Sequence, residues 1–223
     1  MKKLSTMGLA LAGTLAFTSP AHAFLFDGFG DDQGPVTDET AGDGGESSTP
    51  MAITDTDLVG AERTLEANLT GESGASGDIS TEVIDSFFSH TQSSGEEGYT
   101  NVSYTFDATS FGDPLNLALN VTNNDQGGSI DFTLEDAVGG TDTQTIALSE
   151  DETGNFLFSF SGMDVDLSQV NAANLQVWGN ASLDLEADFI EVPAPGVLGL
   201  LGIGLAGIAF VARRRRDTDV AAV

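Results

Sequence analysis

Short runs in which apolar and polar side chains alternate fill much of the chain between residues 51 and 191. Clear examples lie at residues 102–106, 115–121, 130–134 and 183–189, where every second side chain is apolar. A period of two is typical of β-strands that bury one face and expose the other to water. The alternation therefore predicts a succession of short strands, each with one face in a core.

Turn-forming residues separate these runs. Gly112-Asp113-Pro114, residues 123–128 and Gly139-Gly140 are examples of such breaks. The region shows neither an internal repeat nor convincing helical periodicity, although residues 78–89 are compatible with either a strand or a helical turn. This spacing predicts an all-β fold, an antiparallel β-sandwich (jelly-roll-like) ectodomain over residues 51–191.

The N-terminus has the features of a secretory signal. Lys2 and Lys3 precede an apolar run over residues 4–17, and Ala21 and Ala23 place small residues at the two positions that signal peptidase reads. We therefore predict a signal peptide over residues 1–23, export through the Sec translocon and a mature chain that begins at Phe24.

Residues 24–50 are rich in Gly, Asp, Ser and Thr and contain few apolar side chains. A segment of this composition buries too little apolar surface to offset the entropy lost on ordering. We expect it to form an acidic flexible linker before the ectodomain.

The exported part is strongly acidic. Of the 35 Asp and Glu residues, all but Asp217 and Asp219 lie in residues 24–192, where Arg63 is the only basic residue. Such a surface repels nucleic acid and anionic lipid, so no nucleic-acid partner is expected. The absence of cysteine excludes a disulfide scaffold, a thiol nucleophile and a zinc–cysteine site.

Calcium is the one cofactor that the composition suggests. Carboxylate oxygens are the hard ligands that Ca²⁺ takes, and Asp164 and Asp166 are candidate ligands, although no EF-hand spacing accompanies them.

Two features could suggest catalysis. His90 is the only histidine after the signal peptide, and its Ser/Thr-rich surroundings predict an exposed loop without a companion nucleophile motif. Residues 186–191 resemble the Glu-x-Asp-x-x-Glu signature of laminarinase-type glycoside hydrolases, yet alternation explains their acids as the solvent face of a last strand. We therefore predict that the protein is not an enzyme.

The C-terminal region has three parts in a fixed order. A short proline motif, Val192-Pro193-Ala194-Pro195, precedes an apolar run over residues 197–212, and Arg213, Arg214, Arg215 and Arg216 follow it. At about 1.5 Å per residue, the run spans roughly 24 Å as a helix, which is at the short limit for a transmembrane helix across a bilayer core of about 30 Å. Arginine clusters stay on the cytoplasmic side, so residues 217–223 form a cytoplasmic tail.

This order of parts over residues 192–216 resembles the PEP-CTERM sorting signal of Gram-negative bacteria, with Pro-Ala-Pro where the family usually has Pro-Glu-Pro. The strand layout also looks like the jelly-roll-like ectodomains that often precede such signals. The resemblance implies recognition and processing by an exosortase-like membrane protease after transient anchoring in the inner membrane. It also implies delivery to the cell surface or extracellular matrix, where such proteins accompany exopolysaccharide in biofilms.

The function expected from these features is that of an exported, non-enzymatic surface or extracellular-matrix protein. One alternative is a cell-surface carbohydrate-binding module in which Tyr99, Tyr104 or Trp178 stacks on a sugar of an extracellular polysaccharide. Another is a plain single-pass membrane-anchored surface protein that no protease processes.

Overall fold

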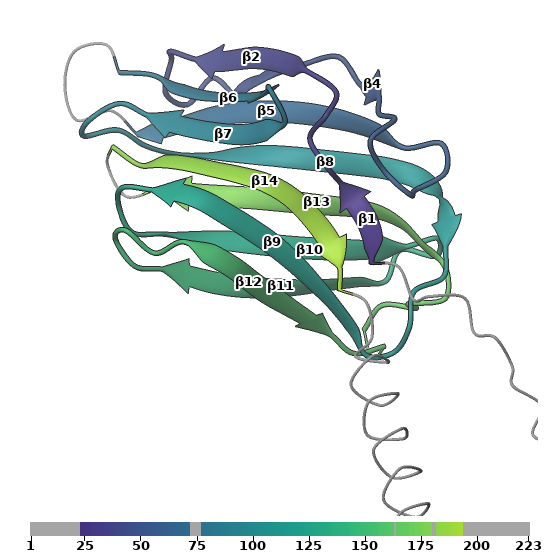
Figure 1. The fold of residues 1–223 in the computed structure, drawn as a ribbon. Helices are drawn as coiled ribbons and strands as arrows, with labels where there is room; N and C mark the ends of the chain where they lie inside the picture. Colours follow the sequence, from purple (N-terminus) through teal and green to yellow (C-terminus); the bar gives the residue numbers. More distant parts are fainter. Residues whose placement is uncertain (1–22, 72–76, 163, 180–181, 194–223) are drawn as a thin grey trace, which may run out of the picture. The chain divides into compact units, whose positions relative to one another are not determined.

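The protein folds into two antiparallel sheets that face each other (Figure 1). The computed structural model describes residues 23–71, 77–162, 164–179 and 182–193, and every strand pairing within them is antiparallel. The predicted all-β antiparallel sandwich is therefore confirmed.

The first sheet, called the β14 sheet, contains seven strands. Their order is β12 (Gly154–Phe160), β9 (Leu115–Asn124), β14 (Asp184–Val192), β7 (Phe87–Gln92), β6 (Ile79–Ile84) and β2 (Gln33–Asp38), with β1 (Phe24–Asp27) paired to β14. Residues 78–89, which the sequence left open, thus form most of the β6–β7 hairpin. Asp85 and Ser86 both have positive φ angles at its two-residue turn, as favoured hairpin turns require.

The second sheet, called the β13 sheet, also contains seven strands. Their order is β11 (Thr141–Leu148), β10 (Gly128–Asp136), β13 (Val170–Gly179), β8 (Glu97–Thr109), β5 (Glu62–Gly71) and β3 (Glu46–Ser47), with β4 (Met51–Ala52) also paired to β5. Five long neighbouring strands, from β5 to β11, give this sheet a broad outer face.

The core lies between the two sheets and is built from the apolar side of each alternating run. Phe26 is fully buried in it and packs edge-on against Tyr104, Phe106 and Phe132 at ring-centroid distances of 5.3, 5.7 and 5.8 Å. Burial of one such side chain stabilises the fold by about 1.5–3 kcal/mol.

The predicted linker over residues 24–50 is wrong. Strand β1 pairs with β14, β2 pairs with β6, and the side chains of Phe26 and Phe29 are fully buried in the core. The segment contains few apolar residues, but those it contains fill the space between the sheets. The sandwich therefore begins at β1, well before residue 51.

Several predicted features lie outside the described residues. These are residues 1–22 of the signal peptide predicted over residues 1–23, the transmembrane span over residues 197–212 and the cytoplasmic tail over residues 217–223. Within the described ranges, the chain has no helix that is long and apolar enough to cross a membrane.

Candidate functional site

The outer face of the β13 sheet carries two adjacent rows of side chains that cross its five long strands. The aromatic row consists of Asn68, Tyr99, Trp178, Ser129 and Ala147, and the polar row consists of Glu66, Asn101, Gln176, Asp131 and Thr145. In each row, successive residues are Cα partners on β5, β8, β13, β10 and β11. The residues that lie between the two rows in sequence, such as Ile130 and Val177, point into the core.

Tyr99 and Trp178 form an aromatic pair in the first row. Their ring centroids are 4.6 Å apart with an interplanar angle of 48°, and Trp178 is 37% exposed. The indole Nε1–H of Trp178 donates a hydrogen bond of 2.7 Å to Gln176 Oε1. This hydrogen bond and the ring contact hold a partly exposed indole in place, an arrangement suited to stacking against a flat ligand surface.

The polar row contains hydrogen-bond acceptors without donors. Asn101 Nδ2 donates to Glu66 Oε2 at 3.0 Å, but Asn101 Oδ1 and Asp131 Oδ1 are buried and receive no hydrogen bond from the described residues. A buried polar atom left unpaired costs about 1–3 kcal/mol. Partial burial of Tyr99, together with the negative charge of Glu66, raises the pKa of Tyr99.

Tyr104 does not belong to this face. The sequence made it a candidate for sugar stacking, but its side chain is almost completely buried, and its hydroxyl donates to Asp27 Oδ2 at 2.9 Å. Of the three aromatic candidates, only Tyr99 and Trp178 come together at the surface.

The Ca²⁺ candidates do not form a recognisable metal centre. Asp166 accepts hydrogen bonds from the Ser168 hydroxyl at 2.7 Å and from Gln169 Nε2 at 2.6 Å, and these bonds lower its pKa. Its carboxylate thus stabilises its own turn, near Asp164. The described part of the chain contains no group of three His, Asp or Glu residues arranged to hold a metal, and Ca²⁺ binding stays a prediction.

The predicted exposed position of His90 is wrong. His90 lies on β7 with no exposed surface, and its Nδ1 is 2.9 Å from the hydroxyl of the buried Thr100. Burial lowers the pKa of His90 to about 4. The sequence signal is the alternation of Phe88, His90 and Gln92, which places the imidazole on the inner side of the strand.

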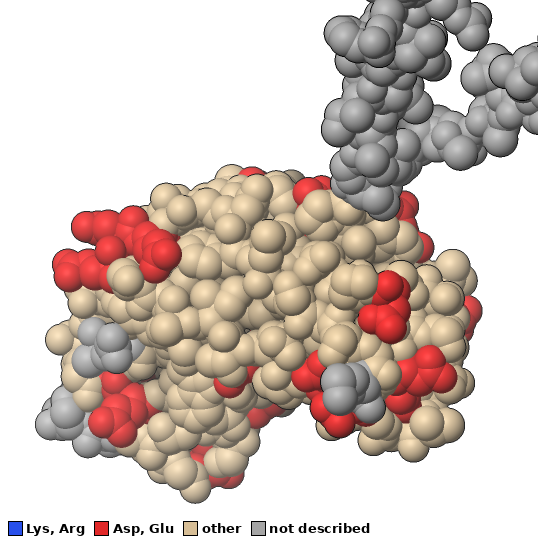
Figure 2. Space-filling view, turned by 90° about the horizontal axis from the view of Figure 1, so that it is seen from below, with Lys and Arg blue, Asp and Glu red and all other residues tan. Residues whose placement is uncertain are grey.

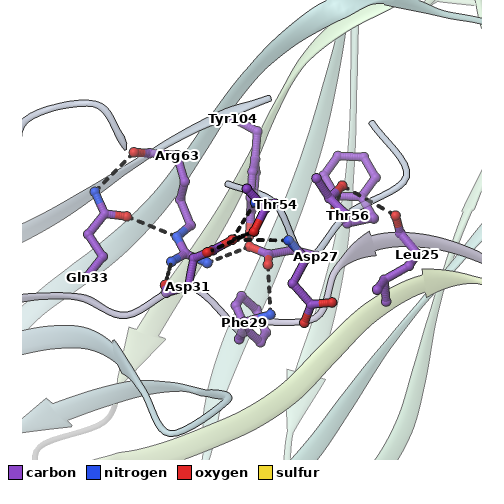
Figure 3. Close-up of polar contacts among 11 residues, drawn as sticks. Leu25, Asp27, Phe29, Asp31, Gln33, Thr54, Thr56, Arg63 and Tyr104 are labelled. Carbon is purple, nitrogen blue, oxygen red and sulfur yellow. Dashed lines mark hydrogen bonds and ion pairs between the residues drawn. The ribbon is translucent and has the colours of Figure 1, made fainter. Parts of the chain in front are cut away.

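Arg63 lies in a buried polar cluster between the sheets (Figure 3). Its Nη1 is 2.8 Å from Asp27 Oδ2, its Nε donates to Gln33 Oε1 at 3.0 Å, and its Nη2 donates to the Asp31 carbonyl. Burial raises the pKa of Asp27, while the positive charge of Arg63 and the hydrogen bonds from Phe29 and Tyr104 oppose that rise. The cluster connects β1, β5 and β8 and has a structural role.

The chain between β1 and β2 closes tightly over this cluster. The Asp31 carboxylate accepts hydrogen bonds from the Thr54 and Asp55 backbone amides (Figure 3). A Cβ atom at Gly28 or Gly30 would collide with the side chain of Asp55, so glycine allows the close approach. Phe29 has a φ of 54°, and its amide donates to Asp27 Oδ1 at 2.8 Å.

The acids of β14 are surface groups, as alternation indicates. Asp184 and Glu186 are exposed, and Asp188 accepts a hydrogen bond of 2.8 Å from Asn120 Nδ2 on β9. Figure 2 shows acidic side chains in separate groups on one face of the molecule, with no basic side chain among the described residues visible there.

The last strand leads directly into the proline motif. Strand β14 ends at Val192, and Val192 is the Cα partner of Phe24, the residue that follows Ala23. Ala21, Ala194, Pro195 and the four arginines Arg213, Arg214, Arg215 and Arg216 lie outside the described residues.

Residues 191–216 match the family model described as the PEP-CTERM protein-sorting motif. The resemblance found in the sequence is therefore confirmed, within one residue of the predicted boundary. The motif indicates a secreted protein with a C-terminal sorting signal.

No match was found among curated proteins. Solved structures with a similar fold include the family 11 carbohydrate-binding module from Clostridium thermocellum, which is 10% identical. That similarity covers 77% of this chain and 96% of the module, with a TM-score of 0.39. A family 29 carbohydrate-binding module is 14% identical over 58% of this chain and 88% of that chain, with a TM-score of 0.36.

An agarase is 10% identical over 52% of this chain, with a TM-score of 0.41, and the matched part is 22% of the agarase chain. The chain thus spans about a fifth of that enzyme. Similarities this low carry no argument about ligand or activity.

Proposed function

We propose that the protein is an exported, non-enzymatic surface or extracellular-matrix protein of a Gram-negative bacterium, processed by an exosortase-like membrane protease. The observation that carries this proposal is the sorting motif over residues 191–216, which begins within the last two residues of β14. The Sec translocon and signal peptidase would act first, at the N-terminal segment.

The pairing of Phe24 with Val192 supports processing at both ends. Cleavage after Ala23 and cleavage near Pro193 would both occur at the same end of the β14 sheet, next to the paired residues. Residues 23–194 form a compact unit by themselves, so neither cut would remove a strand of the sandwich. A protease can act on such a junction without unfolding the domain.

We predict that the extracellular protein begins at Phe24 and ends between Pro193 and Gly196. Intact-mass spectrometry of the protein from the culture medium measures both ends. The control is a strain without the exosortase, in which the chain should stay in the membrane fraction with its arginine cluster. Extracellular protein that retains residues 213–223 would contradict the proposal, because it would show release without processing.

The buried position of His90 supports a non-enzymatic role. Its imidazole and the Thr100 hydroxyl are both fully buried, so no substrate reaches this pair. The exported part contains no second histidine that could serve as a general base.

A second function, polysaccharide binding, is favoured by the aromatic pair of Tyr99 and Trp178. A partly exposed indole beside rows of amide and carboxylate groups offers both a stacking surface and hydrogen bonds, as sugar rings require. Matrix localisation and polysaccharide binding are compatible, since a protein that binds exopolysaccharide would be retained where that polymer accumulates.

We predict that Trp178→Ala weakens binding to exopolysaccharide from the producing cells about tenfold, which corresponds to 1.4 kcal/mol. Truncation of a partly buried aromatic anchor commonly costs more than 1 kcal/mol. A sedimentation assay with purified polymer measures the affinity. Leu157→Ala is the matched control, because Leu157 is an exposed apolar residue, 57% exposed, on β12 of the opposite sheet. Equal affinities of the two variants would argue against this site.

A further inference from the structure

We infer that the ligand of the β13 sheet's outer face is a polysaccharide with free, protonated amino groups. This inference rests on the proposed polysaccharide-binding function and names the class of polymer. Three features of this face support it: the unpaired acceptors of the polar row, the negative charge of that row and the position of the aromatic pair.

Three donors of this face are already used within the protein. Trp178 Nε1–H donates to Gln176, Asn101 Nδ2 donates to Glu66, and Asn174 Nδ2 donates to the Ser103 hydroxyl at 2.9 Å. The acceptors Asn101 Oδ1 and Asp131 Oδ1 lack donors among the described residues, and Asn101 is 9% exposed. A ligand that donates hydrogen bonds therefore complements these two acceptors better than a ligand that only accepts them. An ammonium group has three donors and no acceptor.

The charge of the face points to the same chemistry. Glu66 and Asp131 occupy the polar row on β5 and β10, with Asn101 and Gln176 between them. Arg63, the only basic residue of the exported part, lies in the core beside Asp27 and neutralises neither acid of the polar row. A bound sugar would partly desolvate both carboxylates, which is costly unless the ligand has a compensating positive charge.

An amino-sugar polymer meets both requirements at once. Its ammonium groups can form charge-assisted hydrogen bonds with Glu66 and Asp131, which are roughly twice as strong as neutral ones. The faces of Tyr99 and Trp178 also attract a cation, in addition to stacking on the apolar face of a sugar ring. A uronic acid or sulfated polymer would instead bring negative charge and further acceptors to a face that already has both.

Three oligosaccharides of equal length and linkage test the inference on the full chain in detergent micelles. The probes are a β-1,4-linked glucosamine hexamer, its fully N-acetylated form and cellohexaose, titrated calorimetrically at pH 6 in low salt. We expect the amine hexamer to bind at least tenfold more tightly than the other two. Its affinity should fall as salt screens the carboxylates and as rising pH neutralises the amines.

Two variants that each remove one negative charge test whether Glu66 and Asp131 cause the preference for the amine hexamer. Glu66→Gln and Asp131→Asn preserve side-chain shape, and each should remove most of the preference for the amine hexamer while leaving weaker binding to cellohexaose. Glu62→Gln is the matched control, because Glu62 is an exposed acid on the same strand as Glu66 but outside both rows. Thermal melts of all variants establish that they are folded.

The outcomes separate this inference from the proposed polysaccharide-binding function. If none of the hexamers binds, the amine inference is overturned, and the sedimentation assay with exopolysaccharide from the producing cells decides the polysaccharide-binding function separately. If the neutral hexamers bind as tightly as the amine hexamer, and Trp178→Ala removes that binding, only the amine inference fails. If the amine hexamer binds equally well to Trp178→Ala, its attraction arises from the formal net charge of −28 and not from this face, and the inference is overturned.

Discussion

Arg63→Ala is expected to lower the free energy of unfolding by about 3–5 kcal/mol, because it leaves Asp27 buried without a counter-charge. The two side chains are almost completely buried and meet at 2.8 Å. The substitution also removes the donors to Gln33 and to the Asp31 carbonyl. Since domains are typically stable by about 5–15 kcal/mol, this loss would bring the sandwich close to unfolding.

Urea denaturation of the exported domain measures the loss, and Glu62→Ala is the control. Glu62 is the exposed neighbour of Arg63 on β5, so its removal should change stability by less than about 0.5 kcal/mol. The double variant Arg63→Met/Asp27→Leu should recover part of the loss, since it removes both charges together. A loss below about 1 kcal/mol in Arg63→Ala would show that the ion pair is not important for folding.

The strands were predictable because alternation is a local property. In the run Ile130, Phe132 and Leu134, the apolar character of each residue predicts that it is buried, whichever strand lies beside it. The C-terminal sorting motif was predictable for a similar reason, since its parts are contiguous in sequence.

Composition could not predict that residues 24–50 are folded, because the contacts that hold this segment are made with residues far away in the sequence. Asp27 is 36 positions from Arg63 and 77 positions from Tyr104, and no window of sequence contains these partners together. An average over an acidic, glycine-rich segment also hides Phe26 and Phe29, the two buried aromatic side chains that hold it in the core.

The candidate site depends on strand register, which the sequence does not contain. Tyr99 and Trp178 become neighbours because β8 and β13 pair in the register that makes these two residues Cα partners. A shift of one residue would turn one of these side chains towards the core. Sequence reasoning could therefore name both aromatic residues but could neither pair them nor separate them from the buried Tyr104.

Acid is expected to destabilise the sandwich through His90. Its pKa of about 4 in the folded state lies below the ordinary value of 6.5 that applies to the unfolded chain. Above pH 6.5 the imidazole is neutral in both states, and its full contribution to stability is present. Between pH 6.5 and pH 4 only the unfolded chain takes up the proton, so stability falls with pH by at most about 1.4 kcal/mol per unit.

Between pH 7 and pH 5 the loss from His90 alone should be about 2 kcal/mol. Asp31, Asp136 and Asp166 have lowered pKa values, so their contributions are lost only below their ordinary value of 3.8, outside this interval. The raised pKa of Asp27 has the opposite effect on stability, but it acts equally in the wild-type protein and in a His90 variant, so the difference between the two isolates His90. His90→Gln removes the titrating ring and leaves a polar group for Thr100, so urea denaturation of this variant should show a much smaller change over the same interval. A proton NMR titration in which the His90 ring takes up its proton near pH 6.5 in the folded protein would contradict this account, because a buried imidazole next to Thr100 must stay neutral until the pH approaches 4.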